Sequence, residues 1–221
     1  YVSPRNKERF ERLKKFQLTY EQFERLAVHA KRAGVLFLST PFDIESARFL
    51  GPVVDAIKIA SADNNFYPLI EEVALTGKPA LMSTGLASLQ EIELAHSLVK
   101  ETWRKHNIKQ DLAVLHCVSS YPVPAQEANL AAINTLRTAL RCTVGYSDHV
   151  VGNEAAVMAV AMGARVIEKH FTISNDYSDF RDHQLSADPD TLADLVKRIH
   201  KVNMMLGNGE ISMAECEAAE A

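Results

Sequence analysis

The chain has 221 residues, and 24 Lys and Arg against 28 Asp and Glu give a formal net charge of −4. This small negative charge argues against a general attraction to nucleic acid or to anionic membranes. No signal-peptide pattern and no apolar run of about 18 residues occur. Three cysteines without metal-ligand spacing favour a reducing, cytoplasmic location.

The first predicted elements are two helices, over residues 5–17 and 19–33. Thr19 is placed to cap the second helix, and Gln22 stands at the matching position of a capping box. Gly34 follows as a stop signal, and the chain then leads directly into a β-prone run.

Six apolar, β-branched runs follow, each four to eight residues long and bounded by turn residues. They predict strands over residues 35–40, 56–61, 79–84, 112–117, 142–147 and 164–170. Amphipathic stretches between them predict helices over residues 45–50, 67–75, 88–106, 129–140 and 153–162. This alternation predicts a parallel sheet with right-handed crossovers.

The choice between an open doubly wound sheet and a closed barrel depends on the strand ends. No Gly-rich nucleotide motif follows any strand, whereas every strand ends in polar residues, as at the mouth of a barrel. We therefore predict an α/β fold of the (β/α)8 TIM barrel type. Such a barrel needs eight strands in about 250 residues, so we expect an incomplete barrel holding strands 3 to 8, with the first two missing. Residues 1–206 would form this domain and residues 207–221 a linker.

Two histidines end neighbouring predicted strands. His149 and His170 are 170 − 149 = 21 residues apart, which is about one strand-helix repeat. Parallel neighbouring strands would bring both imidazoles to the same edge of the sheet, where the pair could hold a metal. His116 and Cys117, adjacent on one strand, should point to opposite faces and pack rather than form a nucleophilic dyad.

Seven segments lie at or near the ends of the predicted strands: FLSTPFD (37–43), IKIAS (57–61), NNFYPL (64–69), STG (83–85), HCVSSYP (116–122), YSDH (146–149) and EKHFT (168–172). Together they resemble the sialic acid synthase family. The similarity runs in order from about residue 18 to residue 207. The resemblance implies condensation of phosphoenolpyruvate with an amino-sugar aldehyde, commonly N-acetylmannosamine, to give a nine-carbon 2-keto acid and phosphate. Relatives make legionaminic acid, pseudaminic acid or spore-coat sugars, and usually add a C-terminal antifreeze-like domain, toward which residues 207–221 would lead.

The resemblance assigns residues to phosphoenolpyruvate, whose phosphate and carboxylate need cationic and hydroxyl donors. Those positions are Thr40, Lys58, Ser61, Ser83 and Ser147. A Ser or Thr at a strand end is, taken alone, more often a turn former or a helix cap. Lys58 carries its own signal, because a lysine inside an apolar strand is costly unless it is paired.

The remaining assignments concern the metal, the sugar and the proton carriers. His149 and His170 match the ligands of a divalent ion, Mn²⁺ or Mg²⁺, although ligand identity does not specify the ion. Asp63, where some relatives have Glu, and Asp182 match catalytic acids, and each is otherwise a solvated loop acid. Ser119 and Tyr121 match sugar-contacting positions; some synthases carry Asn at Ser119, which leaves the sugar open.

Two other functions stay open. One is a metal-dependent hydrolase barrel, which needs further His or Asp ligands on early strands. The other is a non-catalytic remnant that binds a ligand. For the synthase we expect only small-molecule substrates as partners, no nucleic acid and no membrane, and a homodimer of the full-length protein.

Overall fold

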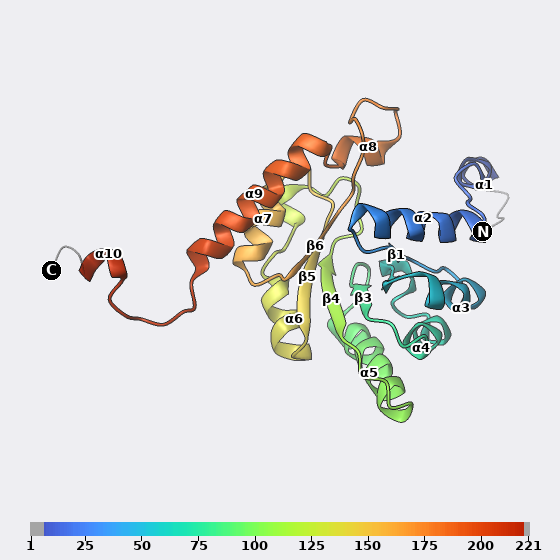
Figure 1. Ribbon diagram of the computed structural model, residues 1–221, viewed down its shortest axis with the longest axis horizontal. Coiled ribbons are helices and arrows are strands. Elements are labelled where there is room, and N and C mark those ends of the chain that lie inside the picture. The colour runs from blue at the N-terminus through green and yellow to red at the C-terminus, as the bar shows by residue number, and fades with distance from the viewer. Residues whose placement is uncertain (1–6, 219–221) are drawn as a thin grey trace.

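A parallel sheet of six strands forms the centre of the protein, in the computed structural model that describes residues 7–218 (Figure 1). The strands are β1 (Leu38–Ser39), β2 (Ala56–Ile59), β3 (Ala80–Ser83), β4 (Leu112–Cys117), β5 (Thr143–Asp148) and β6 (Val166–Lys169). They lie in sequence order, and every neighbouring pair is parallel. The predicted parallel α/β sheet is therefore confirmed.

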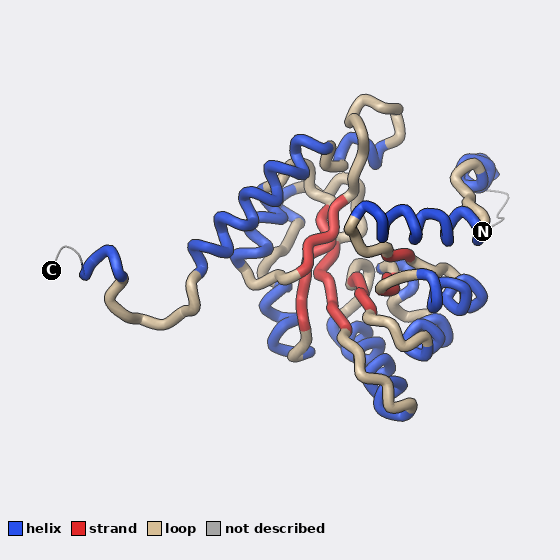
Figure 2. Tube along the Cα trace, in the orientation of Figure 1, coloured by secondary structure: helices blue, strands red, loops and turns tan. Residues whose placement is uncertain are grey.

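Helices connect and cover the strands (Figure 2). They are α1 (Lys7–Lys14), α2 (Tyr20–Ala33), α3 (Ile44–Val53), α4 (Tyr67–Leu75), α5 (Leu89–Lys105), α6 (Ala132–Leu140), α7 (Glu154–Ala161), α8 (Arg181–Leu185), α9 (Pro189–Leu206) and α10 (Glu215–Ala218). Each predicted helix is present, although residues 5 and 6 lie outside the described part. α8, α9 and α10 were not predicted. Among the described helices, none is both long and apolar enough to span a membrane.

The ends of α2 show why this segment is helical. The Thr19 side chain accepts a hydrogen bond from the Gln22 amide, and Gln22 Oε1 accepts one from the Thr19 amide at 2.7 Å. Gly34 closes the helix at φ +76°, a left-handed conformation that glycine adopts without a Cβ penalty. The capping box and the stop predicted from the sequence are both confirmed.

The first strand is shorter than predicted. It covers two residues instead of residues 35–40, and Val35 and Leu36 are 59% and 73% exposed. β1 pairs only with β2 among the described strands, so half of its backbone groups lack a ladder partner. Leu38 pairs with Ala56, the first residue of β2, so residues 35–37 lie beyond the start of that neighbour.

The strand register separates two faces of the sheet, because side chains alternate along each strand. One face carries Ile57, Met82, Val114 and Tyr146, which are buried with the helices in the main core. The opposite face carries Lys58, Ser83, Cys117, Ser147 and Glu168. The polar residues of the predicted site thus share the face that the helices leave free.

The sequential strand order favours a barrel-type sheet over a doubly wound one. Doubly wound sheets reverse their strand order and place helices on both faces, whereas here every crossover returns on the same side. Within residues 7–218, β1 and β6 each pair with one strand, so this part of the sheet is open. The number of strands in a complete barrel stays a prediction.

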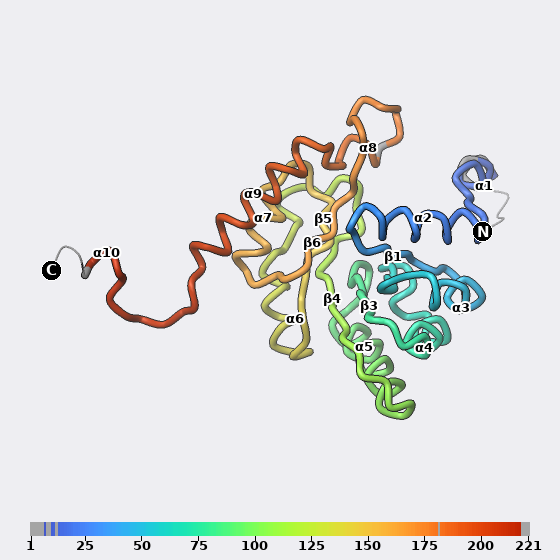
Figure 3. The backbone as a smooth tube through the Cα atoms, in the orientation of Figure 1, coloured from blue at the N-terminus to red at the C-terminus, as the bar shows by residue number. Residues whose placement is uncertain are grey.

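The last described residues lie away from the sheet (Figure 1). α9 packs along α7, and the following residues lead to α10, as the path of the backbone shows (Figure 3). Residues 207–214 have no helix or strand, and every described side chain from residue 203 onward is exposed. That residues 207–221 link to another domain stays a prediction.

Candidate active site

The carboxyl ends of the strands bring the predicted residues to one edge of the sheet. Ser61 opens a short 3-10 turn after β2, Gly85 follows β3, and residues 118–121 follow β4. His149 comes directly after β5 and His170 directly after β6. Because the strands are parallel and in sequence order, these loops all emerge at the same edge.

Lys58 lies inside the sheet and is paired. Its Nζ atom is 3.5 Å from Glu168 Oε2, and its side chain is 11% exposed. Ser147 Oγ donates a 2.7 Å hydrogen bond to the other oxygen, Glu168 Oε1. The cost of burying an ammonium group predicted a partner for Lys58, and the structure supplies a carboxylate on β6.

Glu168 was missed as a site residue, although it stands inside the segment EKHFT. Its signal was a charged residue at the alternating position of a β-prone run, two residues before His170. That position points to the same face as Ser147, which pairs with Glu168 in the register.

A group of hydroxyls surrounds Gly85. The Gly85 amide donates to Ser61 Oγ at 3.1 Å, and a Cβ atom added to Gly85 would collide with the hydroxyls of Ser61 and Ser119. Ser83, on the preceding strand, is 2% exposed, and its Oγ atom has no hydrogen-bond partner among the described residues. The structure thus brings Ser61 and Ser119 together and leaves Ser83 with an unused donor.

The two histidines face one another. Their ring centroids are 5.3 Å apart at an interplanar angle of 64°, and the Tyr121 ring lies 4.2 Å from His149 and 5.6 Å from His170. His149 Nδ1 donates to the Val118 carbonyl at 2.8 Å. Since a carbonyl only accepts, this bond places the proton on Nδ1 and leaves Nε2 as a free lone pair.

Electrostatics differ between the two imidazoles. Burial lowers the pKa of His149, but its contacts with Cys117 and Val118 and the charge of Glu168 outweigh burial and raise it overall. Burial, with the nearby His149, lowers the pKa of His170 against opposing effects of Asp182 and Glu168. The lowered pKa favours the neutral form of His170, which is the form that ligates a metal.

Cys117 joins the hydroxyls to the histidines. Burial raises the pKa of its thiol, but hydrogen bonds with His149, Ser61 and Ser147 lower it overall. His116, its neighbour, faces the other way: Nε2 contacts the Ala128 carbonyl at 2.8 Å and the ring stacks on Tyr146. The two residues point to opposite faces as predicted. Lys58, Glu168, Ser147, Cys117 and Ser61 therefore form one connected site with His149.

The two acids are placed differently. Asp63 ends the 3-10 turn that Ser61 opens, and burial raises the pKa of its carboxyl. Its Oδ2 atom is buried with no hydrogen-bond partner among the described residues. Asp182 comes from α8 and lies close enough to His170 to raise the pKa of that imidazole. Thr40 follows β1, and within the described residues no hydrogen bond joins it to the other site residues.

The histidine pair fits a metal that takes most of its ligands from elsewhere. Among the described residues, no group of three or more His, Cys, Asp or Glu could hold an ion. Two imidazoles, one with its tautomer set by a backbone carbonyl, leave coordination positions for water and substrate. The residues present are compatible with Mn²⁺ or Mg²⁺, although a pair alone does not select between them.

A cavity of about 740 Å³ lies beside the hydroxyl side chains that surround Gly85. It opens between the start of α5, the loop after β4 and the start of α6, and Thr84, Cys117 and Ser119 line it. Its other lining residues are mainly apolar, such as Leu86, Ile92 and Leu136, and neither His149 nor His170 belongs to it. The site therefore combines polar side chains on the open face of the sheet with a neighbouring cavity that is mainly apolar.

Known proteins match this chain over most of its length. The model of the NeuB family matches residues 3–211. An uncharacterised protein of Methanocaldococcus jannaschii is 44% identical over 92% of this chain and 59% of its own length. The N,N'-diacetyllegionaminic acid synthase of Campylobacter jejuni is 37% identical over 89% of this chain and 58% of its own length. The chain thus spans about three fifths of these curated relatives.

A solved structure agrees with the fold. The N-acetylneuraminic acid (sialic acid) synthetase of Leptospira borgpetersenii serovar Hardjo-bovis, in complex with citrate, superimposes with a TM-score of 0.91 at 36% sequence identity. The match covers 98% of this chain and 74% of that one.

Proposed function

Because the chain belongs to the NeuB family, we propose that it carries the catalytic centre of a sialic-acid-type synthase. The reaction joins phosphoenolpyruvate, an N-acylated amino-sugar aldehyde resembling N-acetylmannosamine, and water. The products are a nine-carbon 2-keto sugar acid and phosphate. The observation that carries the proposal is the connected site in which Lys58, Glu168, Ser147 and Cys117 link the hydroxyls around Gly85 to His149.

The anionic groups of phosphoenolpyruvate are assigned to Lys58 and the hydroxyls. Lys58 is buried on the open face of the sheet, and Ser83 has a buried donor without a partner among the described residues. Ser61 and Ser147 stand on the same connected site, and Thr40 completes the set from β1. A buried cation and preorganised donors bind phosphate and carboxylate strongly where water is excluded.

Glu168 balances Lys58 before the substrate enters. A phosphate or carboxylate placed beside Lys58 repels Glu168, which then turns its carboxylate toward a hydroxyl donor of the sugar. Ser119 and Tyr121 lie next to this space and are assigned to the sugar, and the apolar cavity beside Ser119 offers room for an acyl substituent.

The histidines and acids are assigned to the reacting carbonyl. A divalent ion, Mn²⁺ or Mg²⁺, held by His149 and His170 would polarise the aldehyde carbonyl as a Lewis acid. C3 of phosphoenolpyruvate forms the new bond to the aldehyde carbon, whose oxygen gains a proton and becomes a hydroxyl. Water adds at C2 and loses a proton, and the C2–O bond to phosphate breaks.

The carboxyl groups handle these protons. Burial raises the pKa of Asp63, which favours its holding a proton near the reacting groups. Asp182 lies near His170, and we assign it to proton transfer through a water molecule.

The same proposal extends to the complete barrel, the linker and the assembly of the full-length protein. The six strands correspond to strands 3 to 8 of an eight-stranded (β/α) barrel, and residues 207–221 act as a linker toward a further domain. The full-length protein acts in the cytoplasm as a homodimer on small-molecule substrates. No observation favours a hydrolase or a non-catalytic remnant over the synthase.

Phosphate release tests the proposal. The intact protein is incubated with phosphoenolpyruvate and a panel of aldoses, with and without Mn²⁺, and free phosphate is measured. We expect release only when an N-acylated amino-hexose and the cation are both present. Release of phosphate from phosphoenolpyruvate that needs neither the amino-hexose nor the cation, or no release with any aldose, would contradict the proposal.

A further inference from the structure

A buried ion pair lies directly behind the two histidines. Lys169 Nζ and Asp148 Oδ2 are 2.7 Å apart, and their side chains are 5% and 0% exposed. Asp148 precedes His149, and Lys169 precedes His170. Because successive side chains alternate between faces, the ion pair lies on the helix side of the sheet while the imidazoles turn to the site.

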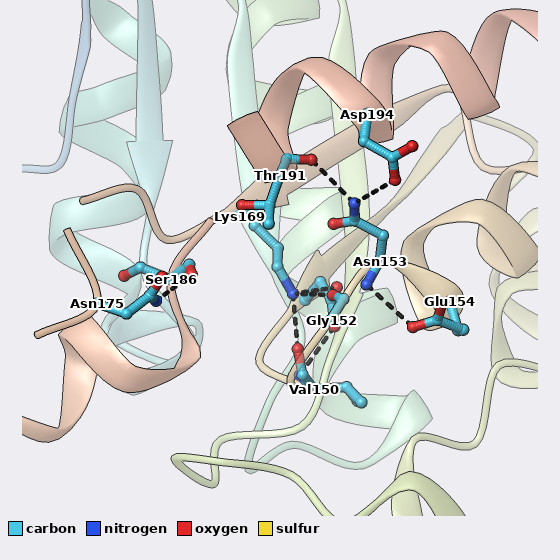
Figure 4. A network of polar contacts seen from close by, with 10 residues as sticks. Val150, Gly152, Asn153, Glu154, Lys169, Asn175, Ser186, Thr191 and Asp194 are labelled. Atoms are coloured by element: carbon cyan, nitrogen blue, oxygen red, sulfur yellow. Dashed lines mark hydrogen bonds and ion pairs between the residues drawn. The ribbon is translucent and has the colours of Figure 1, made fainter. Parts of the chain in front are cut away.

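Lys169 also fixes the loop that follows β5. Its ammonium group donates to the Val150 carbonyl at 2.6 Å and to the Gly152 carbonyl at 2.8 Å (Figure 4). Asp148 Oδ1 accepts a 2.9 Å hydrogen bond from the Val150 amide. All three donors of the ammonium group are used, and the chain on either side of His149 is tied to the residue before His170.

The same loop is held from its other end. Asn153 Nδ2 donates to the Thr191 carbonyl at 2.9 Å and to Asp194 Oδ2 at 3.0 Å (Figure 4). These bonds attach the start of α7 to α9. The segment that carries His149 is therefore anchored to β6 by Lys169 and to α9 by Asn153.

Stability alone is a poor explanation for this arrangement. Removing two charges from water is costly, and apolar residues of similar volume often replace a buried ion pair without loss of stability. What the ion pair specifies is geometry: Asp148 and Lys169 are the last register partners of β5 and β6. Beyond them the strands end, and the next residue on each is a histidine.

We propose that Lys169, through Asp148 and the carbonyls of Val150 and Gly152, is a positioning residue for the histidine pair. It holds His149 and His170 at the separation and orientation at which one divalent cation contacts both. This inference rests on the metal role in the proposed function. It assigns to Lys169 no contact with substrate or cation.

The test compares cation affinity with folding. In the intact protein, Asp148→Asn combined with Lys169→Met removes both charges and keeps an oxygen that accepts from the Val150 amide. Mn²⁺ binding is measured by calorimetry and by electron paramagnetic resonance, and thermal unfolding is followed without metal. We expect Mn²⁺ affinity to fall about 10-fold or more, as when outer-shell partners of metal ligands are lost, with a melting temperature within a few degrees of the parent.

Two further variants serve as references. Arg198→Ala removes an exposed ion pair between α9 and α7, in which Arg198 Nη1 lies 3.1 Å from Glu154 Oε1, and should leave Mn²⁺ affinity unchanged. His149→Ala should abolish most Mn²⁺ binding. If the double variant fails to fold, Lys169→Arg replaces it: the planar guanidinium keeps the charge but does not converge on the same three acceptors, so a smaller loss of affinity is expected.

The outcomes separate the two claims. Parent-like Mn²⁺ affinity in the folded double variant, or in Lys169→Arg if that is the variant measured, would overturn the positioning role while His149→Ala still defines the site. Unchanged affinity in His149→Ala, or no binding by the parent, would instead remove the metal role from the proposed function and the positioning role with it.

Discussion

The β4–β6 half of the sheet and the edge at β1 differ in how they hold the site residues. All six residues of β4 are buried, as are five of six in β5, and α7 and α9 pack behind the histidines. β1 has only two residues, and α2, which lies near it, contains no buried residue. The side of the site that carries the two histidines is therefore fixed by packing and a buried ion pair. The side toward β1 is held by partly buried aromatic rings, with the Phe23 ring centroid 6.5 Å from that of Phe37 and 6.4 Å from that of Phe49.

On the side of the site toward β1, substitution of Lys58 should have the largest effect on activity. Lys58→Met should lower kcat/KM for phosphoenolpyruvate about 10³-fold, because it removes the buried cation facing the substrate anions. The melting temperature should change little, since Glu168 is partly exposed and regains water. Steady-state kinetics and thermal unfolding check both statements.

A matched control for this variant is Arg48→Met, which breaks an ion pair with Glu72 on the outer helices α3 and α4. It should leave kcat/KM unchanged. An equal loss of activity in both variants would mean that Lys58 acts only through general electrostatics or folding.

Leucines on two helices compare the packing of the two sides. Leu136 on α6 is 3% exposed and belongs to the core, whereas Leu26 on α2 is 41% exposed. Leu136→Ala should cost about 2–5 kcal/mol of unfolding free energy, and Leu26→Ala about 0.5 kcal/mol or less. Denaturant unfolding measures both. Similar costs would show that α2 is packed as tightly as α6 in solution.

Gly85 tests the cluster of hydroxyls that Ser61 and Ser119 form on the side of the site toward β1. The added methyl of Gly85→Ala meets the hydroxyls of Ser61 and Ser119, so KM for phosphoenolpyruvate should rise about 10-fold, a cost of about 1.4 kcal/mol. Gly77→Ala is the control: Gly77 has φ +69° and open space around it, so the variant should lose stability but keep KM. A KM effect in Gly77→Ala alone would contradict the assignment.

Asp63 gives the smallest expected effect, a pH-dependent shift in stability. Burial raises its pKa, so the protonated acid contributes stability below its ordinary value of 3.8, and this is lost as pH rises through the folded pKa. Asp63→Asn is neutral at every pH. Its melting temperature relative to the parent should therefore be higher at pH 7 than at pH 4, by about a degree or two. A difference independent of pH would show that the carboxyl is fully solvated.

Local signals in the sequence were sufficient for much of the fold. Thr19, Gln22 and Gly34 define one helix through contacts within a few residues, and β-prone runs ending in polar residues located the strands and their common edge. The free-energy cost of burying the Lys58 ammonium group predicted that it has a charged or polar partner. Segment 189–206 was overlooked as a helix, although Asp188 and Thr191 form a capping box at its start.

Register and long-range pairing explain what the sequence left open. Glu168 and Lys169 are adjacent charged residues, yet one contacts Lys58 on the site face and the other contacts Asp148 on the helix face. Alternation along β6 places the two side chains on opposite faces, and the pairing of β5 with β6 brings each one to its partner. The short β1 likewise follows from its pairing, because residues 35–37 lie beyond the first residue of β2.

The most direct test of the central claim follows the oxygen of water. The intact protein is given phosphoenolpyruvate, an N-acylated amino-hexose and Mn²⁺ in water enriched in oxygen-18, and the released phosphate is analysed by mass spectrometry. A synthase in which water adds at C2 and the C2–O bond breaks predicts phosphate without the label. Phosphate that carries one labelled oxygen would show attack at phosphorus, as in a hydrolase, and would contradict the account.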